Sequence, residues 1–283
     1  MNPILEFILN VVIATVTQML VLFGPLLAVG FLIAFFEKMS NKMLMRIFSF
    51  KAVIFSTGWL GTPIHETGHA LFCLLFGHKI HEFVPFKPER DESGGYTLGY
   101  VKHSCKGSIY NNIGYLFIGT GPIILGSTII ALLIWLLLPK GSGFFGTLHT
   151  HASGADLNFM GYVTMLWETV KSTVEVIFWS EGWGTYGHWE FWVFFVVASC
   201  ISLHMSLSPP DLKSAWKGAG IIALIFLVVN IVLVAIGQTD YMKYFSAYIM
   251  LGAGVLFVGV ILSFVTMILI LIITTILGKL KGK

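Results

Sequence analysis

Two histidines and a glutamate stand close together in the sequence His65-Glu66-Thr67-Gly68-His69. Histidines four positions apart on an α-helix lie on one face, one turn apart, so both imidazoles can bind the same metal ion. Zn²⁺ takes imidazole nitrogens at about 2.0–2.1 Å, and the glutamate beside the first histidine can act as general base on zinc-bound water. The pattern predicts a zinc site with His65 and His69 as metal ligands and Glu66 as the catalytic base.

These ionisable residues occur inside an apolar stretch, residues 52–77, that is long enough to enter a membrane. A charged group in a membrane span costs on the order of 2.5–3.5 kcal/mol on insertion scales, so it needs a compensating partner. A divalent metal ion provides one. The alternative is a set of polar residues that hydrogen-bond across a helix bundle, but that alternative predicts no particular spacing.

A catalytic zinc site needs a third protein ligand and leaves its fourth position open for water or substrate. Asp211 is the preferred candidate, because in Ser208-Pro209-Pro210-Asp211 it directly follows an apolar stretch that two prolines interrupt. Its other possible role is to cap the next helix. His204 is the second candidate, with a buried, hydrogen-bonded histidine as its alternative interpretation. Four glutamates rank lower, because the expected topology puts them on the far side of the membrane: Glu168, Glu175, Glu181 and Glu190.

The composition is that of an integral membrane protein. Of the 283 residues, 56% are hydrophobic and 11% charged, whereas about a quarter of the residues of a soluble domain are charged. The net charge of +3 is small and scattered, which argues against nucleic acid as a partner. The three cysteines are widely spaced and odd in number, so they predict neither a disulfide framework nor a thiolate metal site.

We therefore predict an α-helical polytopic membrane protein with about six transmembrane helices, each of roughly 20 residues or more. Residues 37–51 alternate basic and apolar residues, which is typical of a short amphipathic helix on the membrane surface. Residues 139–154 are expected to form a loop, and residues 157–178 a further helix that lies on the membrane or spans it. The six spans are expected at about residues 10–36, 52–77, 109–138, 190–207, 219–236 and 244–277.

A small membrane-associated β-hairpin is expected after the histidine motif, because short β-like runs flank Ser93-Gly94-Gly95. The expected domains are residues 1–51, an N-terminal transmembrane helix and basic surface segment; residues 52–217, a core that carries the metal site; and residues 218–283, two C-terminal transmembrane helices.

The orientation is predicted from Lys and Arg near the helix ends, which favour the cytoplasmic side. A slight excess of them places the N-terminus, residues 78–107, residues 208–218 and the C-terminal tail on that side. The metal site is then expected to open towards the cytoplasm.

The order of these features resembles the site-2 protease family of intramembrane zinc metalloproteases. The resemblance covers about residues 52–217: the histidine motif in a membrane span, a β-like segment, a span with a Gly-Pro pair, and a span that ends in Pro-Asp. It implies that His65, His69 and Asp211 bind Zn²⁺ and that Glu66 is the base. It also implies that the hairpin helps to present an extended substrate strand.

The leading hypothesis is an intramembrane zinc metalloprotease that hydrolyses peptide bonds of membrane-protein or transmembrane-peptide substrates within or near the lipid bilayer. One alternative is a non-catalytic membrane metal-binding protein, either a transporter or a pseudoprotease scaffold. Another is a membrane metalloprotease of the prenyl-protein-processing type, whose third ligand would be a glutamate such as Glu168 or Glu175. The oligomeric state is left open.

Overall fold

The computed structural model describes residues 2–90, 96–179, 188–238 and 241–280, most of which are helical. The helical elements are α1 (Pro3–Ile47), α2 (Phe50–Val53), η1 (Ile54–Gly58), α3 (Trp59–Leu75), α4 (Ile109–Leu137), α5 (Gly141–Ser153), α6 (Phe159–Val174), η2 (Glu175–Trp179), α7 (Trp189–Ser202), α8 (Pro209–Ala235), η4 (Tyr241–Phe245) and α9 (Ser246–Leu280). The strands are β1 (Lys79–Val84), β2 (Glu89–Arg90), β3 (Tyr96–Thr97) and β4 (Tyr100–Ser104).

Four helices are long and apolar enough to cross a membrane: α1, α4, α8 and α9. Helix α3 has 17 residues and α7 has 14. At 1.5 Å per residue α7 is about 21 Å long, less than the roughly 30 Å of a hydrocarbon core. Helix α3 continues a helical run that begins with α2 and η1, but it carries the polar histidine motif. The predicted count of about six spans is therefore not confirmed, and the described residues provide four candidates.

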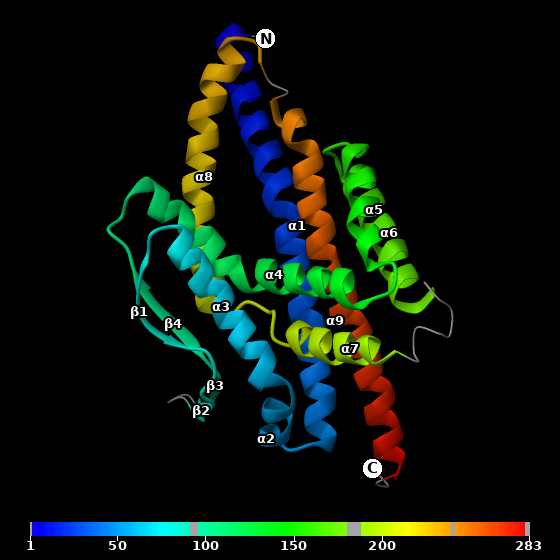
Figure 1. Ribbon diagram of the computed structural model, residues 1–283. Coiled ribbons are helices and arrows are strands. Elements are labelled where there is room, and N and C mark those ends of the chain that lie inside the picture. The colour runs from blue at the N-terminus through cyan, green and yellow to red at the C-terminus, as the bar shows by residue number, and fades with distance from the viewer. Residues whose placement is uncertain (1, 91–95, 180–187, 239–240, 281–283) are drawn as a thin grey trace.

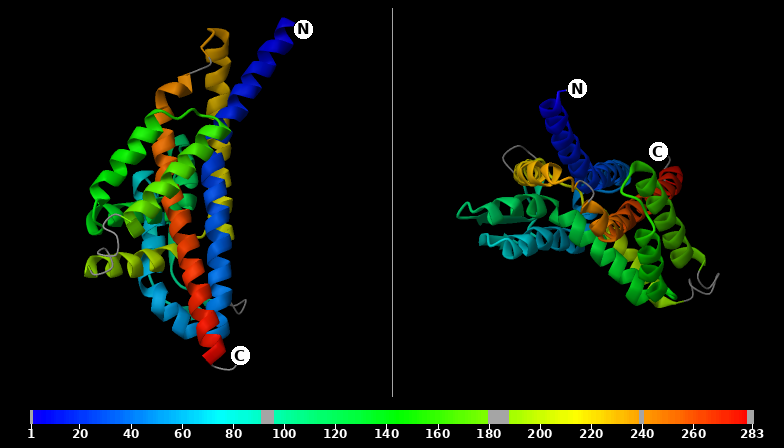
Figure 2. Two further views of the ribbon diagram at one scale, coloured as in Figure 1. Left: turned by 90° about the vertical axis from the view of Figure 1, so that its right-hand side faces the viewer. Right: turned by 90° about the horizontal axis from the view of Figure 1, so that it is seen from above.

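Helices α1 and α9 run side by side in the same direction, α8 runs in the opposite direction beside α1, and α4 crosses the bundle (Figures 1 and 2). The two ends of the chain consequently lie at opposite ends of the molecule (Figure 1). The prediction that both lie on one side is wrong. It assumed an even number of helices along the bundle, whereas α1, α8 and α9 run along it and α4 crosses them (Figure 1).

Helix α1 continues without interruption through residues 37–47, so the predicted separate surface helix is wrong for this segment. Its side chains explain why. Ser40 and Met43 are buried, and Met43 packs with Leu203 and with Ile270 of α9. The apolar side of residues 37–47 therefore packs against protein. As a result, α1 continues as one helix beyond its apolar part.

Residues 139–154, predicted as a loop, contain helix α5. Its buried residues Phe144, Leu148 and Ala152 recur every four positions and form one apolar stripe against the core. The helix predicted at residues 157–178 is present as α6 and η2, and it begins where the side chain of Asn158 accepts a hydrogen bond from the N–H of Gly161.

The predicted hairpin is also present. Strand β1 pairs antiparallel with β4 from Lys79 opposite Ser104 to Val84 opposite Tyr100, and β2 pairs with β3. Its predicted turn, residues 93–95, lies outside the described residues. The hairpin lies beside α3 (Figure 1).

The largest buried cluster joins α4, α5, α6, α7 and α9 with the middle of α1. The histidine motif lies at the border of this cluster, where α3, α4 and α8 meet. The boundaries predicted at residues 51 and 217 fall within α2 and α8, so the second boundary separates Asp211 from the apolar part of its own helix. The domain division stays a prediction.

Candidate metal centre

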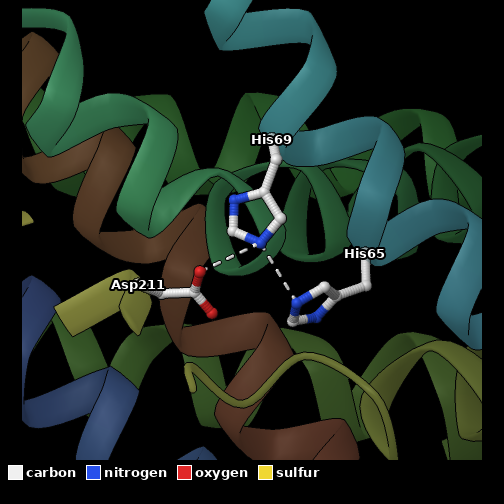
Figure 3. Close-up of side chains that lie close together, drawn as sticks. All are labelled: His65, His69 and Asp211. Atoms are coloured by element: carbon white, nitrogen blue, oxygen red, sulfur yellow. Dashed lines mark hydrogen bonds and ion pairs between the residues drawn. The ribbon is translucent and has the colours of Figure 1, made fainter. Parts of the chain in front are cut away.

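His65, His69 and Asp211 come together, the histidines from α3 and the aspartate from the first turn of α8 (Figure 3). The Nε2 atom of His69 lies 3.2 Å from Nε2 of His65 and 3.4 Å from Oδ1 of Asp211. One ligand atom from each residue lies within 4.8 Å of the other two. Around a tetrahedral ion with bonds of about 2.0–2.1 Å, neighbouring ligand atoms are roughly 3.3–3.4 Å apart. The distances from Nε2 of His69 to Nε2 of His65 and to Oδ1 of Asp211, 3.2 and 3.4 Å, match that geometry.

The ring of His69 is oriented by the backbone carbonyl of Ile118, whose oxygen lies 2.7 Å from Nδ1. Inside an α-helix this carbonyl would accept the N–H of the residue four positions later, but that residue is Pro122, which has no N–H. His65 is oriented in the same way: its Nδ1 lies 2.7 Å from the carbonyl oxygen of His204, just beyond the end of α7. A carbonyl freed by Pro122 within α4 and a carbonyl just beyond the end of α7 thus orient the two rings.

The tautomers of both histidines follow from these contacts. A carbonyl oxygen can only accept, so Nδ1 of His65 and of His69 must donate, and a neutral ring then carries its lone pair on Nε2. Two Nε2 lone pairs that face each other at 3.2 Å repel unless a proton or a cation lies between them. Histidines that bind metals in proteins characteristically donate their other N–H to a carbonyl or carboxylate. The donor set therefore fits a zinc ion.

Asp211 has two functions at the start of α8. Its Oδ2 accepts hydrogen bonds from the N–H of Ser208 at 2.8 Å and from the Oγ–H of Ser208 at 2.6 Å. In return, the N–H of Asp211 donates to Ser208 Oγ at 3.4 Å, which completes a capping box with Ser208 as the N-cap. Oδ1 is left to face His69. The capping role and the ligand position, weighed as alternatives from the sequence, are thus compatible.

Close glycine contacts bring the three helices together. A Cβ on Gly68 would lie 2.7 Å from the backbone carbon of Gly121, and a Cβ on Gly121 would lie 2.6 Å from the backbone oxygen of Gly68. On its other side, α4 meets α8 at Gly119, where a Cβ would collide with the backbone of Asp211. Helix α4 therefore fixes the distance between the histidines and the aspartate.

A cavity of about 480 Å³ opens beside the donor atoms. Helices α3, α4 and α8 form most of its wall, and the hairpin closes one side with residues 97–101 and His103. Glu66 also lines the cavity, and only 7% of this residue is exposed. The three donor atoms and a buried carboxylate thus share one space that can admit a substrate.

His103, on β4, also lines the cavity. Its Nδ1 lies 2.9 Å from Nδ1 of His78, whose Nε2 lies 2.8 Å from the carbonyl oxygen of Asn111. His78 must therefore donate from Nε2, and it accepts the Nδ1–H of His103. Burial first, and then the neighbouring His78 and His69, hold the pKa of His103 below its ordinary value, so its ring is neutral near pH 7. No sequence pattern marks this residue, because only the hairpin register brings it to the cavity.

The other candidate ligands lie elsewhere. The ring of His204 turns away, with Nδ1 3.1 Å from the carbonyl oxygen of Cys200, so that His204 contributes its backbone carbonyl alone. Glu168 is paired with Lys171 at 2.6 Å and lies 3.5 Å from His151. Glu181 lies outside the described residues. Within the part of the chain that the structure describes, the one group of three or more His, Cys, Asp or Glu placed to hold a metal ion is His65, His69 and Asp211.

The fold and the site together define a mostly helical protein with four candidate membrane spans and a His-His-Asp group suited to zinc. Residues 58–171 match the model of a protein family described as "Putative zincin peptidase". This match supports a zinc metallopeptidase. It contains the histidine motif, the hairpin and α4, and it ends before Asp211, whose assignment therefore depends on the geometry. Comparisons with curated proteins and with solved structures gave no match.

Proposed function

We propose that the protein is a membrane-embedded zinc metalloendopeptidase of the site-2 protease type, which cleaves membrane-protein substrates within or near the bilayer. The observation that carries the proposal is the set of donor atoms on His65, His69 and Asp211, spaced as zinc ligands and facing the cavity that Glu66 lines. The family match to residues 58–171 supports the zinc peptidase part. The long apolar helices around the site support the membrane part.

Each residue of the site has a chemical role in this proposal. Zinc held by His65, His69 and Asp211 would supply a Lewis acid for the scissile carbonyl and would make water a stronger nucleophile at neutral pH. The carbonyls of Ile118 and His204 keep both histidine rings aimed at one point, and Ser208 does the same for the Asp211 carboxylate. Glu66 accepts the proton of the attacking water and passes it to the leaving amine.

The substrate must enter the cavity in an extended conformation, because a helix hides its carbonyls in internal hydrogen bonds. The hairpin is suited to this task, since residues 97–101 form part of the wall of the cavity that the metal-binding group also lines. Addition of a substrate strand to the hairpin would hold the scissile bond extended in the cavity.

The cavity opens, in our proposal, towards the cytoplasm. Lys38, Lys42 and Arg46 lie near the end of α1 that is also the end of the molecule where the C-terminus lies (Figure 1). The first 37 residues contain no Lys or Arg. Because basic residues favour the cytoplasmic side, this end of α1 faces the cytoplasm. Asp211 lies at the end of α8 that points the same way.

Glu66→Gln tests the proposal, because it keeps the size of the side chain and removes the base. Proteoliposomes with wild-type protein or the variant are incubated with membrane proteins from cells that lack the protein, and new N-termini are identified by mass spectrometry. We expect new N-termini within apolar segments with the wild type, and none with the variant although it binds zinc. Equal cleavage by both proteins would contradict the role of Glu66, and new N-termini confined to water-exposed domains would contradict cleavage in the bilayer.

A further inference from the structure

A basic pocket follows directly on an apolar groove along α1. The groove, of about 610 Å³, lies between α1, α4 and α8 and has almost entirely apolar walls. The pocket, of about 660 Å³, is lined by Lys38, Lys42 and Arg46 together with Ser206. Ala34 forms part of the wall of both, so the two spaces adjoin at this residue of the helix.

One face of α1 connects them. Leu20, Leu27 and Phe31 are exposed along the groove, and Lys38 and Arg46 continue the same face at intervals of seven and eight residues, or about two helical turns. This face changes from apolar to basic within the one turn after Ala34. A ligand that fits it must be apolar over most of its length and negatively charged at one end.

The charge of the pocket is not compensated within the protein. Among the described residues, no carboxylate lies within ion-pair distance of Lys38, Lys42 or Arg46. The pocket also contains Glu37, whose Oε2 accepts the backbone N–H of Ser206 at 3.0 Å. Three cations therefore face one carboxylate that is already hydrogen-bonded to the protein, which leaves an excess of positive charge.

We infer that the groove and the pocket together bind one anionic phospholipid, with an acyl chain along the groove and the phosphate against Lys38, Lys42 and Arg46. A free phosphate would not use the groove, and a transmembrane helix would leave the cations unpaired. Anionic lipids are concentrated in the cytoplasmic leaflet, which is the side proposed for this end of α1. The inference concerns lipid binding alone and does not depend on peptidase activity.

Lipid binding by the purified full-length protein tests this site. The protein in detergent is titrated with phosphatidylglycerol or with phosphatidylcholine of the same acyl chains, and bound lipid is counted by native mass spectrometry. We expect the wild type to prefer phosphatidylglycerol. Replacing Lys38, Lys42 and Arg46 together by Gln should lower its affinity for phosphatidylglycerol by roughly 100-fold, since each cation near an anionic headgroup contributes about a factor of five. Phosphatidylcholine binding should change little.

The control variant removes the same charge elsewhere, with Lys79, Lys106 and Lys279 replaced by Gln; these exposed residues line neither space. If both triple variants lose the same affinity for phosphatidylglycerol, the effect comes from surface charge in general, and the proposed lipid site is wrong. An unchanged preference in the first triple variant would overturn it as well.

Ala34→Phe tests the groove independently, because it blocks the junction of the two spaces and keeps all charges. It should weaken the binding of both lipids. Unchanged lipid binding by this variant would contradict a phospholipid as the occupant of the groove. Displacement of phosphatidylglycerol from the wild type by equimolar inorganic phosphate would contradict it as well. So would a dimer of the wild-type chain that Ala34→Phe abolishes.

Discussion

Gly68 of the histidine motif and Gly121 of α4 lie in reciprocal backbone contact, each in the space that a Cβ on the other would need. This contact lets α3 approach α4 until Nδ1 of His69 reaches the carbonyl oxygen of Ile118 at 2.7 Å. Because the metal-binding group depends on that approach, the packing of two helices and the orientation of a ligand are parts of the same arrangement.

Gly121→Ala should separate α3 from α4. Overpacking a tight contact costs about 1–3 kcal/mol, and here the movement also lengthens the hydrogen bond that orients His69. We expect a lower temperature of thermal unfolding together with a lower zinc content of the purified protein. Gly143→Ala is the control, since a Cβ at Gly143 meets nothing within 4 Å. A Gly121→Ala protein with normal zinc content and stability would show that the helices can separate without effect.

Pro122→Ala restores an N–H four residues after Ile118. This N–H competes with His69 for the Ile118 carbonyl, so the ring loses part of its orientation. Partners of metal ligands of this kind contribute about 10–100-fold to metal affinity, and we expect a loss in that range in competition with a zinc chelator. Pro25→Ala, in the apolar part of α1, should leave the affinity unchanged. If Pro122→Ala binds zinc as tightly as the wild type, the free carbonyl is not important for the site.

Ser208→Ala removes the Oγ–H hydrogen bond to Oδ2 of Asp211 and the side-chain N-cap of α8, and it keeps the hydrogen bond from the backbone N–H of residue 208. Loss of a cap costs about 1 kcal/mol of stability, and the Asp211 carboxylate, then held by one hydrogen bond instead of two, should bind zinc about 10-fold more weakly. Ser49→Ala removes the cap of α2, far from the site, and should affect stability alone. Zinc affinity that falls equally in both variants would argue against a specific role of Ser208.

Glu37→Leu should disturb the segment between α7 and α8. Glu37 accepts the N–H of Ser206 at 3.0 Å, and this segment carries the carbonyl that orients His65 as well as the start of α8. We expect an altered absorption spectrum of the cobalt-substituted protein, which reports ligand geometry. Glu37→Gln keeps an acceptor and should restore the wild-type spectrum. The same spectrum in all three proteins would mean that Glu37 has no positioning role.

The features that could be predicted from the sequence are local. The spacing of His65 and His69, the β-like runs of the hairpin, and the proline pair before Asp211 are each visible within a few residues. Helix α5 was missed because its Gly, Ser and His content masks a four-residue apolar repeat.

The orientation of the ligands could not be predicted, because it depends on contacts between distant elements. Pro122 is visible in the sequence, but nothing there indicates that the carbonyl it frees points towards His69. In the same way, His204 could be singled out as a candidate, but its backbone carbonyl and not its ring contacts the site. The predicted number of spans was not confirmed, because α7 has only 14 residues and α3 carries the polar histidine motif.

The central claim is that a carboxylate from α8 completes a zinc site with the two histidines of α3, and Asp211→Asn tests it most directly. Asn111 forms the same capping box with Ser108 at the start of α4, so an asparagine at position 211 should preserve the start of α8 while removing the charge. Zinc per chain is measured by plasma mass spectrometry on protein purified without chelator. We predict about one zinc per chain in the wild type and a small fraction of that in a folded Asp211→Asn variant. Equal zinc in both proteins, or no zinc in the wild type, would contradict the account.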